Sequence, residues 1–244
     1  MRTSQLVTSY IQAVIFMALG VRSVSGWFSE RDRRSGHLAV AAGLFGLQSL
    51  ISAVDGTVWN SAKAQTPPRA LSVFTSILLL VAVYAFLLFL SDFIAYPRWI
   101  HGLLILSTLT TVVFTIIERP DLRFDPQKGI VPIPGIHNPI NYRTYIGYLL
   151  VYLAIAFGVL AFAFLVYGFR AEGLARFRML SIGSGFLLFF IVIGLLPRLL
   201  FGNPSAHTIQ NLINFLQYVA LLVAPLLLVG FAPPKFIRSR FSTT

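Results

Sequence analysis

The most constraining feature of this sequence is a stretch from Ala70 to Ser91 that contains no charged side chain. A membrane-spanning helix needs roughly 20 apolar residues, because the hydrocarbon core is about 30 Å thick and each helical residue rises about 1.5 Å. The chain as a whole is 57% hydrophobic and 11% charged, whereas a soluble domain is about 25% charged. Its apolar runs are continuous and not alternating, which favours helices over the strands of a membrane barrel. The composition therefore predicts an all-α, polytopic membrane protein.

Six further apolar stretches accompany this one, so we predict a seven-transmembrane-helix bundle over residues 1–232. A Pro-rich outer loop is expected over residues 118–144, and a basic cytoplasmic tail over residues 233–244. The predicted spans cover about residues 5–24, 38–55, 70–91, 100–117, 145–169, 179–201 and 208–232.

The basic residues between the spans predict the orientation. Lys and Arg outside the spans number ten on the side of the C-terminal tail and seven on the side of the N-terminus. Several of those seven flank or lie in the long loop, and charges in long loops count less for topology. We therefore expect the N-terminus outside and the C-terminus in the cytoplasm. The membrane is expected to be a bacterial cell membrane.

The N-terminal stretch has a competing interpretation as a signal peptide cleaved after Val24-Ser25-Gly26. Its apolar run is long for a signal peptide and contains Tyr10 and Gln12. Cleavage would also place the Arg-rich first loop outside. We favour a retained first span.

The loop over residues 118–144 contains Pro120, Pro126, Pro132, Pro134 and Pro139. Proline fixes φ and cannot continue a helix or a central strand. A loop of this length is often a lid or a binding loop. A stiff outer cap without a ligand is the equal alternative.

Polar residues inside the spans are the candidate ligand site. A charge in hydrocarbon costs about 2.5–3.5 kcal/mol on insertion scales, so Arg198 should face the bundle interior, pair, or reach the headgroups. We hypothesise an outward-opening pocket in which Arg198 pairs with Asp55 or binds an anionic ligand. The alternative is that Arg198 reaches outer headgroups while the amides link helices. The full candidate set is Arg198, Asp55, Asn211, Asn214, Gln217, Tyr10 and Gln12.

Two further features concern packing. Arg22 and Asp92 both lie near the inner interface, and a solvated pair between them would contribute little. Glycines without Cβ atoms let helix backbones approach one another in a membrane. The glycines expected at such contacts are Gly43, Gly46, Gly147, Gly158, Gly183, Gly185 and Gly194.

Several classes of protein are excluded by what the sequence lacks. There is no Cys, and no two histidines share the spacing of a metal site inside a span. Retinal needs a lysine inside the bundle, but Lys63, Lys128 and Lys235 all lie outside the spans. No nucleotide-binding or hydrolase motif is present. We expect no cofactor, no metal, no nucleic-acid partner and no catalytic residue.

The last predicted span ends abruptly. It carries polar residues in its first half and then leaves the membrane through Pro233 and Pro234 into a tail with Lys235, Arg238 and Arg240. We interpret Pro233 and Pro234 as the exit of a signal.

Four soft motifs carry a family resemblance over nearly the whole chain: SERDRRSGHLAVAAGLFGL, VYAFLLFLSDFIAYPRW, ARFRMLSIGSG and LLVGFAPPKFIR. On these, the chain resembles the seven-transmembrane N-terminal sensor regions of bacterial histidine kinases and related diguanylate cyclases. In that family the last helix leads into a cytoplasmic output module. Here the chain stops at Thr244, so the resemblance implies a sensor region without its output, or a relative that needs a partner.

The leading hypothesis is a membrane-embedded sensory module that relays an outer or intramembrane signal to a cytoplasmic output domain or partner. The expected partners are the lipid bilayer and a cytoplasmic kinase or other signalling protein, with a homodimer left open. The alternative is a small transporter or channel subunit that uses Arg198, Asp55 and the amides as a substrate path. A lipid-acting enzyme using Asp92, His101 or Glu118 ranks last, because these residues are scattered.

Overall fold

The computed structural model describes residues 3–61, 69–94, 97–118, 122–125, 129–132, 142–201 and 206–241. Within these residues, seven long helices, one short helix and one hairpin make up the fold. The elements are α1 (Thr3–Glu30), α2 (Arg33–Ser61), α3 (Arg69–Ser91), α4 (Arg98–Glu118), β1 (Leu122–Asp125), β2 (Gly129–Pro132), α5 (Tyr142–Arg170), α6 (Gly173–Phe201), α7 (Ala206–Phe231) and α8 (Lys235–Phe241).

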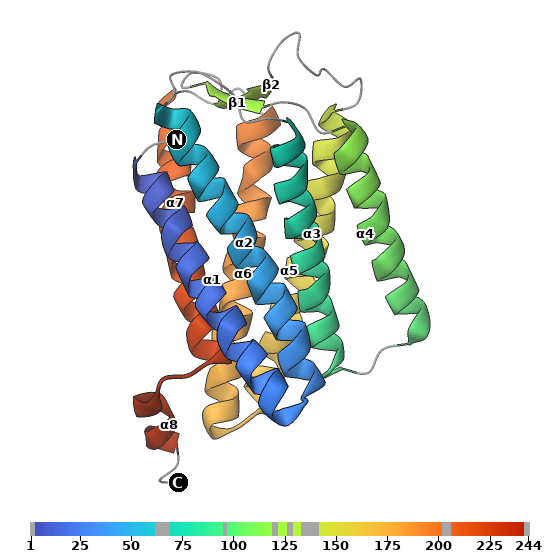
Figure 1. Cartoon of the computed structure of the whole chain (residues 1–244), viewed down its shortest axis with the longest axis vertical. Helices are drawn as coiled ribbons and strands as arrows, with labels where there is room; N and C mark the ends of the chain where they lie inside the picture. Colours follow the sequence, from blue (N-terminus) through green and yellow to red (C-terminus); the bar gives the residue numbers. More distant parts are fainter. Residues whose placement is uncertain are drawn as a thin grey trace.

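The seven long helices run alternately up and down and form a closed bundle (Figure 1). Each helix contacts the next one along the chain, and α7 returns to contact α1, which closes the ring. The hairpin lies at one end of the bundle and α8 at the other (Figure 1). We call these the hairpin end and the α8 end.

Six of the seven predicted spans are confirmed as helices of sufficient length and apolarity. Among the described residues, six helices can cross a membrane, or up to seven if Leu221–Phe231 and Lys235–Phe241 form one bent span. The helices are longer than the predicted spans, and α6 begins at Gly173, six residues before the predicted start at Met179. Its extra turns carry charged residues that lower the hydropathy without breaking the helix.

Close glycine contacts join α1 to α2 and α6 to its neighbours. A Cβ added to Gly46 would lie 2.8 Å from the backbone nitrogen of Met17, and one added to Gly183 would lie 2.9 Å from that of Leu165. The prediction for Gly46, Gly183, Gly185 and Gly158 is thus confirmed, and the backbone of Gly43 faces Gly20 at about the same spacing. The prediction of a close contact is wrong for Gly147 and Gly194, because an added Cβ would meet no described atom within 4 Å.

Aromatic residues dominate the core between α2, α3, α5, α6 and α7. Phe86 and Phe186 are almost completely buried and meet edge to face, with ring centroids 5.3 Å apart. Phe86 also stacks on Phe231 at the end of α7, at 6.4 Å. Such pairs are worth about 0.5–1.5 kcal/mol beyond burial alone. The end of α7 is therefore held by the core and not only by the lipid.

The long loop contains a structure that the sequence analysis did not predict. Strands β1 and β2 pair antiparallel, with Leu122 opposite Pro132 and Asp125 opposite Gly129. Pro132 lies at the end of its strand, where a missing N–H donor is tolerated. The hairpin contacts α6, so this end of the bundle is partly covered.

The predicted basic tail contains a short helix that the sequence analysis did not predict. After α7 ends at Phe231, the chain bends by 53° and continues as α8. Pro233 is buried and Pro234 is half-buried at this bend. We call the segment from Gly230 to Lys235 the α7–α8 joint.

Candidate functional site

Tyr10, Gln12 and Asp55, which were predicted to line an outward-opening pocket, lie on α1 and α2 toward the hairpin end. The Tyr10 hydroxyl lies 2.9 Å from Oγ1 of Thr57, at hydrogen-bonding distance. Gln12 and Asp55 are both half-buried. The Tyr10–Thr57 contact links the two helices at this end.

The remaining members of that pocket have side chains outside the described residues. The backbone of Arg198 belongs to α6, and that of Asn211, Asn214 and Gln217 belongs to α7. Their side-chain contacts lie outside what the structure describes, so the outer pocket stays a prediction.

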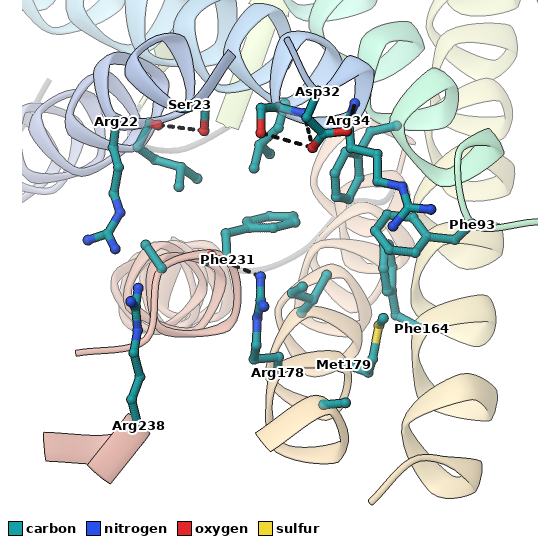
Figure 2. A pocket seen from close by; sticks show the side chains of 18 residues that line it. Arg22, Ser23, Asp32, Arg34, Phe93, Phe164, Arg178, Met179, Phe231 and Arg238 are labelled. Atoms are coloured by element: carbon teal, nitrogen blue, oxygen red, sulfur yellow. Dashed lines mark hydrogen bonds between the residues drawn. The ribbon is translucent and has the colours of Figure 1, made fainter. Parts of the chain in front are cut away.

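Asp92 has a different partner from the one predicted. Its Oδ2 lies 2.7 Å from Nδ1 of His37, in a half-buried contact between the end of α3 and the start of α2. The proposed pair between Asp92 and Arg22 was wrong because Arg22 points away from α3, into a cavity at the α8 end (Figure 2).

This cavity is the most distinctive site among the described residues. It has a volume of about 500 Å³ and lies among α1, α2, α3, α5, α6 and the α7–α8 joint. We call it the basic cavity, because four arginines reach it from four different helices (Figure 2). Its lining residues are Leu19, Arg22, Ser23, Gly26, Asp32, Arg34, Ser35, Leu38, Phe89, Phe93, Phe164, Ala175, Arg178, Met179, Ile182, Phe231, Ala232 and Arg238.

The turn between α1 and α2 places Arg34 at the cavity. Arg31 adopts a left-handed φ of 52° and ends α1, with its N–H donating to the carbonyl of Trp27. Asp32 then caps α2: its Oδ1 accepts from the N–H of Arg34 and its Oδ2 from the N–H of Ser35. The guanidinium of Arg34, in the first turn, lies 4.8 Å from the ring centroid of Phe93.

Asp32 is the only carboxylate among the described residues that line the basic cavity. Burial works to raise the pKa of Asp32, but hydrogen bonds from the N–H of Arg34, the Ser35 hydroxyl and the Ser35 N–H outweigh it. The pKa therefore lies below its ordinary value of 3.8. The nearby charge of Arg34 contributes to this lowering as well. Asp32 thus offsets part of the positive charge of the cavity.

Two arginines of the cavity hold the α7–α8 joint. Nε of Arg178 donates to the carbonyl of Gly230 at 3.1 Å, and its Nη2 donates to the carbonyl of Phe231 at 3.3 Å. The last carbonyls of a helix lack partners within the helix and carry its negative dipole end. Nε of Arg238 donates to the carbonyl of Pro233 at 2.9 Å. The same side chains thus line the cavity and fix the backbone that leaves α7.

The cavity carries an excess of positive charge. None of Arg22, Arg34, Arg178 and Arg238 forms an ion pair with a residue that the structure describes. Figure 2 shows Arg22 from α1 and Arg238 from α8 pointing toward one another across the end of α7. Guanidinium groups stay charged at any physiological pH and present a planar fork of donors. The arrangement suits an anion.

The opposite wall of the cavity is apolar. Phe89 meets Phe231 with ring centroids 5.3 Å apart and Phe93 at 5.0 Å, and Phe93 meets Phe164 at 6.1 Å. Phe89, Phe164 and Phe231 are buried, so the half-buried ring of Phe93 is the part of this cluster that reaches the cavity surface. The basic cavity therefore offers both charge and apolar contact to one ligand.

A second cavity lies between α3, α4 and α5 and has a volume of about 360 Å³. Its walls are aliphatic apart from Ser107 and Tyr152, and no charged residue lines it. The Tyr152 hydroxyl already lies 2.8 Å from Oγ1 of Thr108. This second cavity presents little chemistry by which a particular ligand could be recognised.

Sequence reasoning missed the basic cavity, because its arginines were interpreted only as determinants of orientation. One signal was present: Arg34, Arg178 and Arg238 were all predicted on one side of the membrane, and Arg22 at the same interface. What the sequence could not give was that the ring closes and brings them around one hollow. Among the described residues, no group of three or more His, Asp or Glu side chains could hold a metal ion.

The fold defines this chain as a multi-pass, all-helical membrane protein with six, up to seven, candidate spans, which implies a lipid bilayer around it. Comparison with known proteins adds no closer assignment: no protein-family profile matches the chain, and no curated protein matches it.

Proposed function

We propose that the protein is a membrane-embedded sensory module in which the basic cavity receives an anionic ligand and the α7–α8 joint carries the response. In this proposal the α8 end faces the cytoplasm, and α8 acts on a cytoplasmic output domain or partner. The supporting observation is that Arg178 and Arg238 line the cavity and also donate hydrogen bonds to the backbone of the joint. The proposed input is thus at the α8 end and not in the outer pocket predicted around Arg198.

Competition for the hydrogen bonds of Arg178 and Arg238 would couple ligand binding in the basic cavity to the α7–α8 joint. An anion among the arginines is a stronger acceptor than a backbone carbonyl, because it adds the attraction between opposite charges to the hydrogen bond of the guanidinium. Arg178 would turn from Gly230 and Phe231 toward the ligand, and Arg238 from Pro233. The carbonyls at the joint would then turn to water, and α8 would change its angle to α7.

The size of the response is bounded by the ligand's preference for one state. A ligand shifts an equilibrium only by its differential affinity for the two conformations. Changing the ratio from 1:99 to 99:1 needs a preference of about 10⁴-fold, or about 5.5 kcal/mol. The two bonds of Arg178 and the one of Arg238, exchanged for bonds to an anion, supply only part of this. We therefore expect a graded shift of α8 and not a complete switch.

The test measures the position of α8 directly. The chain has no cysteine, so the double variant Ser29→Cys and Ser239→Cys takes one spin label at the exposed end of α1 and one on α8. In nanodiscs of zwitterionic lipid, adding inorganic phosphate should broaden or shift the label-to-label distance. Arg178→Gln should produce the shifted distribution without phosphate.

The matched control is Arg176→Gln, which removes one positive charge from the same helix end. Arg176 is exposed and lies outside the basic cavity, so its loss should leave both the distance and the phosphate response unchanged. A distance that ignores phosphate and is the same in Arg178→Gln and in the parent would refute the proposal.

A further inference from the structure

We propose that the ligand of the basic cavity is an amphipathic phosphate, with its phosphate among the arginines and its apolar part against the aromatic wall. This inference rests on the proposed function, because it names the chemical class that the same site would sense. It goes beyond that proposal in excluding simple anions and carboxylates as the preferred ligands.

The charge of the cavity favours phosphate over carboxylate. Among the described residues, four guanidinium groups and one carboxylate line it, which leaves three positive charges, since four minus one is three. A phosphate monoester carries about −1.5 to −2 charges at pH 7 and three acceptor oxygens, whereas a carboxylate carries one charge and two oxygens. With its larger charge and its third oxygen, the phosphate can engage more of these arginines at once than a carboxylate can.

The donors that would bind the phosphate are already in place. No hydrogen bond links the guanidinium groups of Arg22 and Arg34 to a residue that the structure describes. The guanidinium of Arg34 lies over the ring of Phe93, so its edge donors remain available. Arg22 comes from α1 and Arg34 from α2, on the far side of the cavity from α6 and α8 (Figure 2). A phosphate between these two pairs would link four helices.

The apolar wall requires an apolar part in the ligand. A free phosphate ion would leave the half-buried side chains of Phe93 and Met179 in contact with water, whereas Phe89 and Phe164 are already buried by the protein. Burying apolar surface contributes about 25 cal/mol per Å², so a hydrocarbon or ring attached to the phosphate should add affinity. The cavity also lies where the candidate spans end, near Ser29, Arg33 and Phe231. A ligand can therefore arrive from the lipid headgroup layer or from water.

The first experiment compares an amphipathic phosphate with two ligands, one that shares only its hydrocarbon and one that shares only its phosphate. Binding of octyl phosphate, octanoate and inorganic phosphate is measured on the full chain in nanodiscs of zwitterionic lipid. We expect octyl phosphate to bind at least ten-fold more tightly than either of the others. Octanoate keeps the hydrocarbon but replaces the phosphate with a carboxylate, so it tests the contribution of the phosphate. Inorganic phosphate lacks the hydrocarbon, so it tests the contribution of the apolar part. Equal affinity for octyl phosphate and either partial ligand would overturn the inference.

The second experiment assigns the site. Arg22→Gln and Arg34→Gln should each weaken octyl phosphate binding about ten-fold, which corresponds to about 1.4 kcal/mol and to the loss of one charge-assisted contact. Both side chains are exposed at the cavity, so these variants should fold. Arg176→Gln should bind like the parent. If the two cavity variants bind octyl phosphate as well as Arg176→Gln does, the assignment is overturned.

A third arm separates the two sources of the phosphate. Nanodiscs that contain phosphatidic acid should compete with octyl phosphate if the natural ligand is a lipid headgroup. If they do not compete while octyl phosphate binds, the ligand is a soluble amphipathic phosphate. The distance between the two spin labels then separates failure of the sensory function from failure of the ligand assignment. Arginine-dependent binding that leaves α8 in place refutes the sensory function alone, whereas a phosphate-driven movement of α8 without tighter binding of octyl phosphate refutes the amphipathic ligand alone.

Discussion

The contact between α1 and α2 gives a sharp prediction from two glycines three positions apart on one helix. A Cβ on Gly46 would lie 2.8 Å from the backbone nitrogen of Met17 and 2.9 Å from its Cγ. The Met17 side chain can rotate away, but the nitrogen can move only if α1 moves. A Cβ on Gly43 would meet no described atom within 4 Å. We therefore expect Gly46→Ala to destabilise the bundle and Gly43→Ala to be tolerated.

The magnitude follows from two opposing terms. Alanine favours a helix interior over glycine by about 0.8–1.0 kcal/mol, and this gain is common to both variants. Overpacking a close contact costs about 1–3 kcal/mol, and only Gly46→Ala incurs it. The difference in unfolding free energy between the two variants should therefore be about 1–3 kcal/mol. Gly43→Ala itself should be as stable as the parent, or up to about 1 kcal/mol more stable.

The assay is reversible unfolding of the two variants in mixed micelles at increasing mole fractions of a denaturing detergent, followed by circular dichroism. Comparing the variants with each other removes the common helix-propensity term. Gly46→Ala should unfold at a lower fraction of denaturing detergent than Gly43→Ala does. Coincident unfolding curves would show that α1 and α2 do not approach at Gly46, and the packing described for this pair would then be refuted.

Three further predictions concern the α8 end. Gly173→Ala should lower the unfolding free energy by about 1–2 kcal/mol, because Gly173 has a left-handed φ of 55°; thermal unfolding measures it. A double-mutant cycle of His37→Ala and Asp92→Ala should give a coupling of about 0.5–1.5 kcal/mol, and zero coupling would contradict the 2.7 Å contact. Asp32→Ala should cost about 1 kcal/mol through loss of the helix cap. Since folding lowers the pKa of Asp32, this difference should persist at neutral pH and vanish as the pH falls through that lowered pKa.

The spans could be predicted because the bilayer imposes a length and a polarity that few other environments require. The run from Ala70 to Ser91 matches α3 at its C-terminal end and within one residue at its start. Helix ends were predicted less well, because hydropathy falls at the first charge whereas helical hydrogen bonding continues into water. This explains why α2 begins at Arg33 and not at Leu38.

The hairpin and α8 were missed for local reasons. The prolines of the long loop argue against a helix or a central strand there, but Pro132 occupies the last position of β2, where no ladder bond is required of it. In the tail, the sequence predicts only an exit through Pro233 and Pro234 into a basic segment. Pro234 instead accepts from the N–H of Ile237 and of Arg238, so it begins the first turn of α8.

The basic cavity could not be predicted, because two physical demands place arginines at the same level of the bundle. Orientation requires basic residues at the cytoplasmic ends of spans, and an anion site at that interface requires the same residue type. A sequence therefore carries one signal for two causes. Hydrogen-bond partners separate the two causes. Arg176 and Arg178 are both exposed, but Arg178 donates to the carbonyls of Gly230 and Phe231, whereas an arginine that serves orientation alone needs no such partner. That distinction depends on α7 returning beside α6, which is a property of the closed ring and not of any one segment.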